Sequence, residues 1–241
     1  ARYIVLGILS LVCWFSTAAS TATCGQQLDT SNRLYDSFEA LAGLSTVPYV
    51  LQCDATLQDG TCVLNTTRVI PPAGVPTRLE VKGNILIAAR DNASKVTLSC
   101  MTGLEFVAHG YIKVGRGVSL MAKTLLLQGA SVQVTDAASV CANDELKVVS
   151  SSSLSVVSHS SVISIFDAVT LTGSDVTIDW GAAVISERKG FGDGVVLGQP
   201  SGTPCNTVSV AGHGSKVTST QGGITMTCTG GTVTLSDGAA L

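Results

Sequence analysis

The stretch 129–184 repeats one phrase three times: Gly129-Ala130-Ser131-Val132, Ser151-Ser152-Ser153-Leu154 and Gly173-Ser174-Asp175-Val176. Each copy follows a short aliphatic run and has another aliphatic residue eight positions after its last member, namely Val140, Val162 and Val184. The constant spacing of about 22 residues indicates a repeat architecture, in which each unit buries its apolar face against the next. The repeat therefore decides the fold class.

Within each repeat the hydrophobic pattern alternates with a period of two, as in Val132-Gln133-Val134. Alternation places one side of a strand in the core and the other side outside. Gly, Ser, Asp and Asn, which tolerate tight corners, separate the strands. Three short strands and three corners fill one repeat, so we predict an all-β parallel β-helix (a β-solenoid) whose aliphatic residues stack in interior ladders. An antiparallel sandwich is the alternative, although a sandwich does not require its strands to recur at a constant spacing along the sequence.

The composition agrees with a solenoid that has hydroxyl groups outside. Only 13% of the 241 residues are charged, and the mean hydropathy is +0.42. Disorder requires low hydrophobicity and high net charge, which this chain lacks. A net charge of -3 and a pI near 5.5 leave no basic surface, so we predict no nucleic-acid partner. Outward Ser and Thr then take the place of charged residues.

The two ends of the chain carry different expectations. Arg2, the apolar run 3–15 and the small residues after it predict a secretory signal peptide over residues 1–22; an uncleaved anchor or a buried strand is the alternative. No later run is long enough to span a bilayer, so the mature chain is expected to be secreted, without a membrane span. Residues 79–241 are predicted to form the rungs, interrupted by a loop at 187–207, and to continue beyond Leu241.

Residues 23–78 are predicted to form an N-terminal cap and entry region. Leu34, Phe38, Leu41 and Leu44 fall on one face of a helix, and Gly43 lies where such a helix would stop. A short amphipathic helix over 36–44 would cap the open first rung; an irregular segment is the alternative.

The cysteines predict disulfides, because an exported protein matures in an oxidising compartment. Cys53 and Cys62 enclose a turn, and the separation of Cys205 and Cys228 is close to one rung. Two further candidates, Cys100 and Cys141, are separated by nearly two rungs, which is too far unless one rung is short. The partner of Cys24 stays open. No ligand spacing indicates a metal site or another cofactor. Two sequons, at Asn65 and Asn92, predict N-glycosylation in exposed loops.

The Gly-x-x-Val phrases, together with the passage Ile185-Ser186-Glu187-Arg188-Lys189-Gly190-Phe191-Gly192, resemble the pectin-lyase-like, right-handed parallel β-helix superfamily. More narrowly, the chain resembles non-enzymatic secreted or surface β-helix repeat proteins of protists. The resemblance covers about residues 79–241. It implies a structural or adhesive role at a cell surface, wall or extracellular filament, with surface glycans or further copies of the chain as partners.

The same superfamily contains polysaccharide lyases and hydrolases, so catalysis has to be argued from residues. Gly212-His213-Gly214 is similar to an element of polygalacturonases, but the paired Asp and the other elements of that family are missing. Asp175 and Asp179 could be considered as a pair of acids. We nevertheless predict no catalytic residues and no enzyme. The alternative is a carbohydrate-active enzyme with its site in the loop 187–205 or beyond residue 241. Thr-x-Thr phrases near the end also suggest ice binding as a third function.

Overall fold

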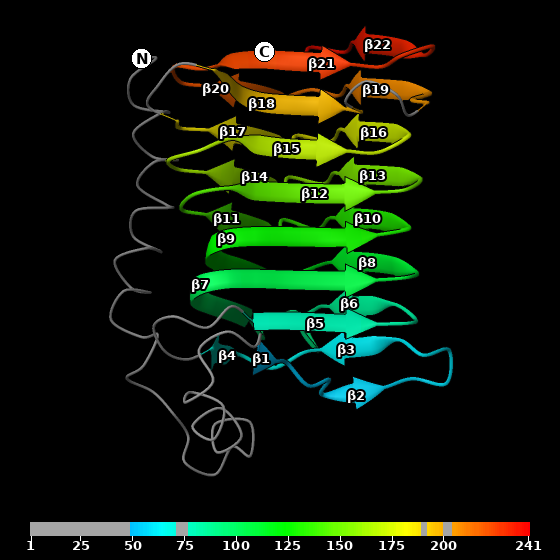
Figure 1. Ribbon diagram of the computed structural model, residues 1–241, viewed down its shortest axis with the longest axis vertical. Coiled ribbons are helices and arrows are strands. Elements are labelled where there is room, and N and C mark those ends of the chain that lie inside the picture. The colour runs from blue at the N-terminus through cyan, green and yellow to red at the C-terminus, as the bar shows by residue number, and fades with distance from the viewer. Residues whose placement is uncertain (1–48, 71–76, 189–191, 200–203) are drawn as a thin grey trace.

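The computed structural model describes residues 49–70, 77–188, 192–199 and 204–241, and all the elements found there are strands. The chain winds into a parallel β-solenoid of about seven turns, as the repeat predicts (Figure 1). The predicted signal peptide and the predicted capping helix both lie outside the described residues. Each turn of the solenoid carries three strands, which stack on their equivalents in neighbouring turns to form three faces.

We call these faces A, B and C. Face A contains β1 (Tyr49–Val50), β5 (Thr77–Val81), the second halves of β7 (Val96–Ala108) and β9 (Val118–Gly129), then β12 (Leu146–Ser150), β15 (Val169–Thr172), β18 (Asp193–Gly198) and β21 (Gly223–Thr227). Face C contains β4 (Arg68–Ile70), the first halves of β7 and β9, then β11 (Ser139–Ala142), β14 (Ser161–Ser164), β17 (Ala183–Ser186) and β20 (Lys216–Ser219). Because β7 and β9 each bend around a corner, these two faces form one hydrogen-bonded sheet.

Face B is a separate sheet of the described residues. It contains β2 (Ala55–Thr56), β3 (Cys62–Leu64), β6 (Ile85–Ile87), β8 (Tyr111–Val114), β10 (Ser131–Val134), β13 (Ser153–Val156), β16 (Asp175–Ile178), β19 (Thr207–Val210) and β22 (Thr232–Leu235). Every pair is parallel except β2 with β3, which form an antiparallel hairpin at the first turn. This hairpin closes the N-terminal edge of face B.

The predicted interior ladders are confirmed. On face B, Val132 pairs with Leu154 and Leu154 with Val176, each one repeat further along the chain. On face C, Val140, Val162 and Val184 form the equivalent ladder. All six side chains are buried in one continuous apolar core. Apolar area removed from water, at about 25 cal/mol per Å², is the main source of stability for such a stack.

The corner between faces B and C repeats with the same period. Asp136, Ser158 and Trp180 have φ angles of 57°, 57° and 54°. The next residue in each corner, Ala137, His159 or Gly181, also has a left-handed conformation. In the central corner the His159 N–H donates to the Trp180 carbonyl of the next rung at 2.9 Å. Left-handed geometry costs a non-glycine residue about 1–2 kcal/mol, so the stacked rungs impose this turn on the sequence.

Two of the predicted boundaries were wrong. The rungs begin before residue 79, because β3 already pairs in parallel with β6, and β4 with β7. The segment 187–207 is not one loop, because it contains β18, which pairs with β15 and β21. Gly198 ends β18 with a φ of +97°, and a Cβ there would lie 1.9 Å from the Thr227 carbonyl oxygen. This glycine, one of those that suggested a loop, is needed instead for close packing of rungs.

Candidate functional site

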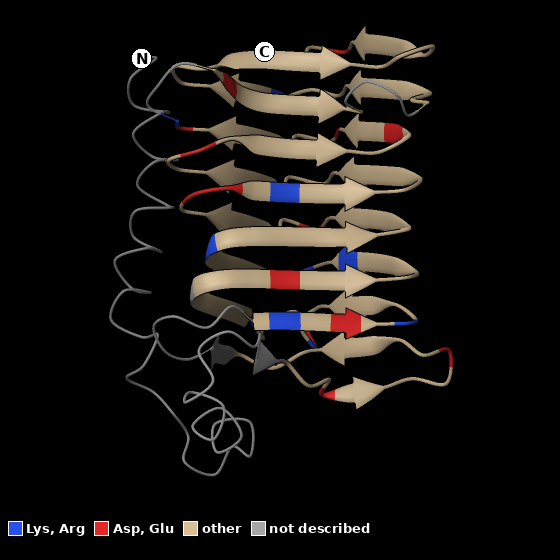
Figure 2. Cartoon of the chain, viewed as in Figure 1, with Lys and Arg blue, Asp and Glu red and all other residues tan. Residues whose placement is uncertain are grey.

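The outward side chains of face B form a column of hydroxyl groups. The outward ladder begins with Lys113 and Gln133. The next four rungs toward the C-terminus contribute Ser155, Thr177, Ser209 and Thr234. Charged residues are sparse over the whole solenoid (Figure 2). Successive rungs are about 4.8 Å apart. Face B therefore presents uncharged hydrogen-bonding groups at a regular spacing.

The two acids considered as a catalytic pair have structural partners. Asp175 accepts hydrogen bonds from the Thr207 hydroxyl at 2.5 Å and from the Asn206 amide at 3.2 Å, one rung above. Asp179 accepts the Trp180 N–H at 2.6 Å. Four residues along an extended strand separate their Cα atoms by about 13 Å. Inverting glycosidases keep two carboxyl groups about 6.5–9.5 Å apart across the scissile bond. Here both carboxylates are hydrogen-bonded to groups of the solenoid itself.

The histidines lie at exposed corners. His159 lies against Gly181 of the next rung, where a Cβ would be 2.5 Å from its Nδ1. His213 lies beside Gly238, and His109 follows β7. Nowhere in the described ranges do three or more His, Cys, Asp or Glu residues gather in a way that could hold a metal ion. The Gly-His-Gly element thus belongs to a corner turn.

Residues at the ends of the 187–205 segment hold the rungs together. Arg188 forms an ion pair with Asp167 at 3.6 Å, and it donates to the Asp193 carbonyl oxygen at 3.0 Å. The Asp193 carboxylate accepts the Thr225 hydroxyl at 2.8 Å. These contacts clamp the start of β18 between its neighbours. Residues 189–191 and 200–203 lie outside the described part of the chain.

On face A, Arg78 forms ion pairs with Glu80 and Glu105, both at 2.8 Å. The hydrogen bond to Glu80 and then the one to Glu105 raise the pKa of Arg78. Lys147 pairs with Glu145 at 2.7 Å in the same way. These exposed pairs neutralise charge along face A, although each adds only about 0–1 kcal/mol to stability.

Two predicted disulfides are confirmed. Cys53–Cys62 ties the first turn, with Cα atoms 5.3 Å apart, and Cys205–Cys228 joins adjacent rungs at 4.9 Å. Cys100 and Cys141 keep buried thiols. Their strands are two rungs apart, and Cys100 belongs to the interior whereas Cys141 belongs to an outer cluster. Cys24 lies outside the described residues.

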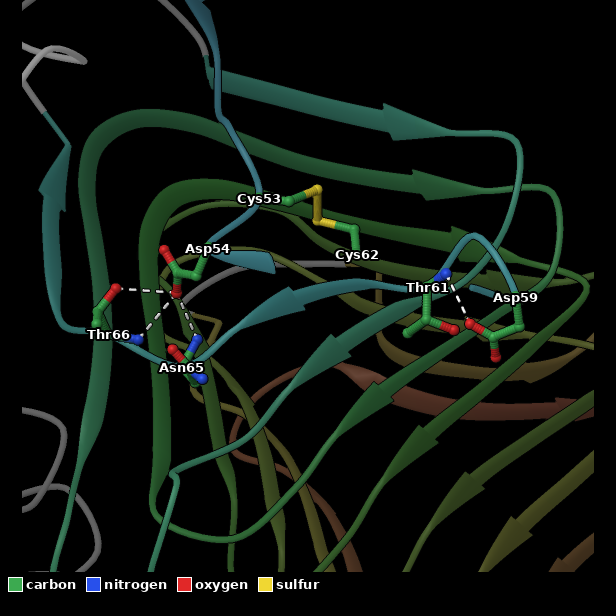
Figure 3. Close-up of a disulfide and its surroundings, with 7 residues drawn as sticks. All are labelled: Cys53, Asp54, Asp59, Thr61, Cys62, Asn65 and Thr66. Atoms are coloured by element: carbon green, nitrogen blue, oxygen red, sulfur yellow. Dashed lines mark hydrogen bonds between the residues drawn. A yellow bond between two sulfur atoms is a disulfide. The ribbon is translucent and has the colours of Figure 1, made fainter. Parts of the chain in front are cut away.

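The N-terminal turn engages one of the two sequons (Figure 3). The Asp54 carboxylate accepts the N–H groups of Asn65 at 2.6 Å and of Thr66 at 3.1 Å, and the Thr66 hydroxyl at 2.9 Å. Oriented to satisfy its neighbours, the Asn65 amide donates to Asp54 at 3.2 Å and accepts from Arg90 at 3.1 Å. Its nitrogen, to which a glycan would be attached, is therefore hydrogen-bonded to a carboxylate.

Asn92 has a different environment. It lies in an exposed turn, where its carbonyl oxygen accepts a hydrogen bond from Arg116 and leaves the amide nitrogen outside that contact. The neighbouring Asp91 accepts N–H groups from Ala93 and Ser94 at 2.9 and 2.8 Å. The Ser94 hydroxyl and these N–H groups lower the pKa of Asp91. Likewise, the Thr61 hydroxyl and N–H lower the pKa of Asp59 in the first hairpin. Of the two sequons, Asn92 is the more accessible.

An apolar ladder on the outside of face C was not predicted from the repeat. Met121, Cys141, Ile163 and Ile185 stack on successive rungs and form a cluster separate from the core, together with Ile165 and Ala183. The signal is present in the sequence, because Val162-Ile163 and Val184-Ile185 break the alternation with two consecutive apolar residues. Such a pair indicates a strand that is covered on both sides.

No helix in the described ranges has the length and hydrophobicity needed to cross a membrane. Comparison of the chain with protein-family models, with curated proteins and with solved structures finds no match.

Proposed function

We propose that this protein is a secreted, glycosylated β-solenoid that acts as a structural or adhesive component of a cell surface, wall or extracellular filament. Non-enzymatic surface proteins of protists with a pectin-lyase-like fold provide the functional model. The observation that carries the proposal is the hydroxyl column on face B. A rigid array with a repeat of about 4.8 Å can bond repeatedly along an extended polysaccharide, each contact adding about 0.5–1.5 kcal/mol.

Two further observations support an extracellular, non-catalytic role. The two disulfides favour an oxidising compartment. The acids and the arginine near the candidate catalytic segments are used in hydrogen bonds that hold the rungs. The competing function is a carbohydrate-active enzyme whose site lies in the 187–205 segment or beyond residue 241.

Expression in a eukaryotic secretory host tests export. We expect the chain in the medium, without residues 1–22 and with a glycan on Asn92, detected as a mass that N-glycan removal lowers. Asn92→Gln removes this mass, whereas Asn65→Gln, the matched control, leaves most of it. Retention in the cell with residues 1–22 intact and Cys205–Cys228 reduced would contradict secretion.

Incubation of the secreted chain with pectin and related polyuronides separates adhesion from catalysis. We expect retention on the polymer without release of new ends. Ser155→Ala/Thr177→Val removes two hydroxyl groups from the column without adding charge, and the loss of about two hydrogen bonds lowers retention about tenfold or more. Thr170→Val, an outward change on face A, is the control and keeps retention. Robust release of ends that Asp193→Asn or His213→Ala abolishes would favour the enzyme instead.

A further inference from the structure

Trp180 is the most exposed of the large apolar side chains in the described part of the chain, with an exposed fraction of 70%. It lies in the corner between faces B and C, where its φ of 54° is left-handed. This conformation is an outlier for a bulky residue, because the side chain crowds the backbone. The corner gains little buried apolar area in return. A strained residue that packs against little points to a functional site.

The equivalent corners show that the turn itself does not require an indole. The same four-residue turn closes five successive corners between faces B and C, with a hydrogen bond of 3.1–3.3 Å from its last N–H to its first carbonyl. The second residue of the turn is Asp136, Ser158, Trp180, His213 or Asp237. The other four are polar, so the reason for an aromatic residue at 180 has to be sought outside the turn.

Trp180 lies between two exposed histidines on neighbouring rungs. From the rung below, the His159 N–H donates to the Trp180 carbonyl at 2.9 Å. On the rung above, the turn that contains His213 lies directly over Trp180, because a Cβ at Gly212 would be 3.0 Å from the Trp180 nitrogen. Both imidazoles are exposed. With about 4.8 Å between rungs, the corner presents an indole with one imidazole on each side.

The charges along this corner favour a neutral ligand. The five turns, together with the residue that follows each of them, contain the acids Asp136, Asp179 and Asp237 and a single Lys or Arg, Lys216. The Asp179 carboxylate accepts the Trp180 N–H at 2.6 Å. An anionic sugar or an anionic lipid surface would meet an excess of negative charge here, and like charges disfavour binding.

A sugar ring matches the chemistry of the corner. The face of an indole is apolar and carries the negative side of the ring quadrupole. A pyranose ring with equatorial hydroxyl groups presents C–H groups on its face and its hydroxyls at its edge, so it lies flat on an indole. A neutral imidazole has one donor and one acceptor nitrogen, which can bond to the hydroxyls at the edge. β-1,4-Linked glucose units have this shape, and they form an extended chain.

We propose that His159, Trp180 and His213 form a subsite for a neutral β-1,4-linked glucan. One sugar ring stacks on the indole, and the glucan runs along the corner between faces B and C. The inference rests on the proposed adhesive function, for which it names a class of glycan. Thr177 of the hydroxyl column is three residues before Trp180, or about 10 Å along the chain, so the column and the corner can be tested separately.

The fluorescence of Trp180 tests the stacking. The chain contains two tryptophans, so in the full chain with Trp14→Phe the tryptophan emission comes from Trp180 alone. We expect cellohexaose to cause a saturable change in this emission, and hexagalacturonic acid to need a concentration at least about tenfold higher. No response to cellohexaose, or an equal response to both sugars, would overturn the proposal. So would a response to phosphatidylcholine vesicles in place of the sugar, which would assign Trp180 to a membrane surface.

Trp180→Asn separates a binding role from a packing role. Asn adopts the left-handed conformation more readily than Trp, so we expect the midpoint of thermal unfolding to stay the same or to rise. The affinity for cellohexaose, measured by calorimetry, should fall at least about tenfold. A lower midpoint would make the indole a packing residue, and an unchanged affinity would remove it from the site; either result overturns the proposal. Phe166→Asn, which changes an aromatic residue exposed to 60% between faces C and A, is the matched control and keeps the affinity.

Failure of this subsite is distinguishable from failure of the proposed function. If Ser155→Ala/Thr177→Val lowers retention on polyuronides while cellohexaose leaves the emission of Trp180 unchanged, the hydroxyl column binds glycans and the corner subsite is wrong. If cellohexaose changes the emission while the polyuronides are not retained, the corner subsite is correct and the role assigned to the column is wrong.

Discussion

Replacing Val176 by Asp is expected to abolish folding of the central rungs, whereas Thr177→Asp, one residue along the same strand, is expected to leave the fold unchanged. Val176 is fully buried between Leu154 and Val208 in the interior ladder of face B. Thr177 points outward in the hydroxyl column. An uncompensated buried carboxylate costs several kcal/mol, a large part of the roughly 5–15 kcal/mol by which domains are stable.

Far-UV circular dichroism and thermal unfolding measure the difference. We expect Val176→Asp to lose the strand spectrum and the cooperative transition, and Thr177→Asp to keep both. If both variants unfold, or both keep the spectrum and the transition, Val176 is not the buried residue and Thr177 the outward one. That result would contradict the interior ladder of face B.

The second large effect is expected at Phe106. This side chain is among the largest that are fully buried, and it stacks between Leu79 below and Leu127 above. Phe106→Ala leaves a cavity that spans these rungs and should lower the free energy of unfolding by about 3–5 kcal/mol. The urea midpoint measures the loss, with an unchanged slope if the cooperative unit is the same.

The neighbouring Glu105 supplies the control. Its carboxylate faces outward and pairs with Arg78. Since exposed ion pairs contribute little, Glu105→Ala should cost less than about 1 kcal/mol. If Phe106→Ala lowers the free energy of unfolding no more than Glu105→Ala does, the ladder that contains Phe106 is not buried inside face A.

The central rungs could be predicted from the sequence because two of their three faces recur at one interval. From β10 to β17, ladder partners on faces B and C are separated by 22 residues, so similar phrases return at equal intervals. On face A the partners Leu125, Leu146 and Val169 are separated by 21 and then 23 residues, because the corners on either side differ in length. Earlier and later rungs were harder to recognise. Ile85 pairs with Ile112, and Val176 pairs with Val208, and in both cases the intervening turn of the chain is longer. The strands of successive rungs stay in register although the corners between them differ in length. A search of the sequence for a fixed period finds only the rungs whose corners add up to the same length, and it misses the others.

A further phrase of the same form, Ala93-Ser94-Lys95-Val96, lies on a different face of the solenoid. Ala93–Val96 resembles the face B phrases, but Val96 belongs to face C, where it pairs with Val118. The face B equivalent in that turn is Ile112, which pairs with Val132 at a slightly shorter spacing than the central rungs have. A spacing close to one repeat therefore does not identify the face on its own.

The candidate site was predictable only where rung geometry limits the choices. Cys205 and Cys228 could be paired because adjacent rungs are within disulfide range. The contact of Asn65 with Asp54 depends on how the first hairpin folds back. No local pattern encodes it.

The parallel stacking of the rungs is tested most directly by an engineered cross-link on face B. Ser155 and Thr177 are ladder partners on adjacent rungs, about 4.8 Å apart. We expect Ser155→Cys/Thr177→Cys to form a disulfide under oxidising conditions, identified as a linked peptide by non-reducing mass mapping. Gln133→Cys/Thr177→Cys, two rungs or about 9.6 Å apart, is expected to form none. No link in the first pair together with a link in the second would contradict the solenoid register.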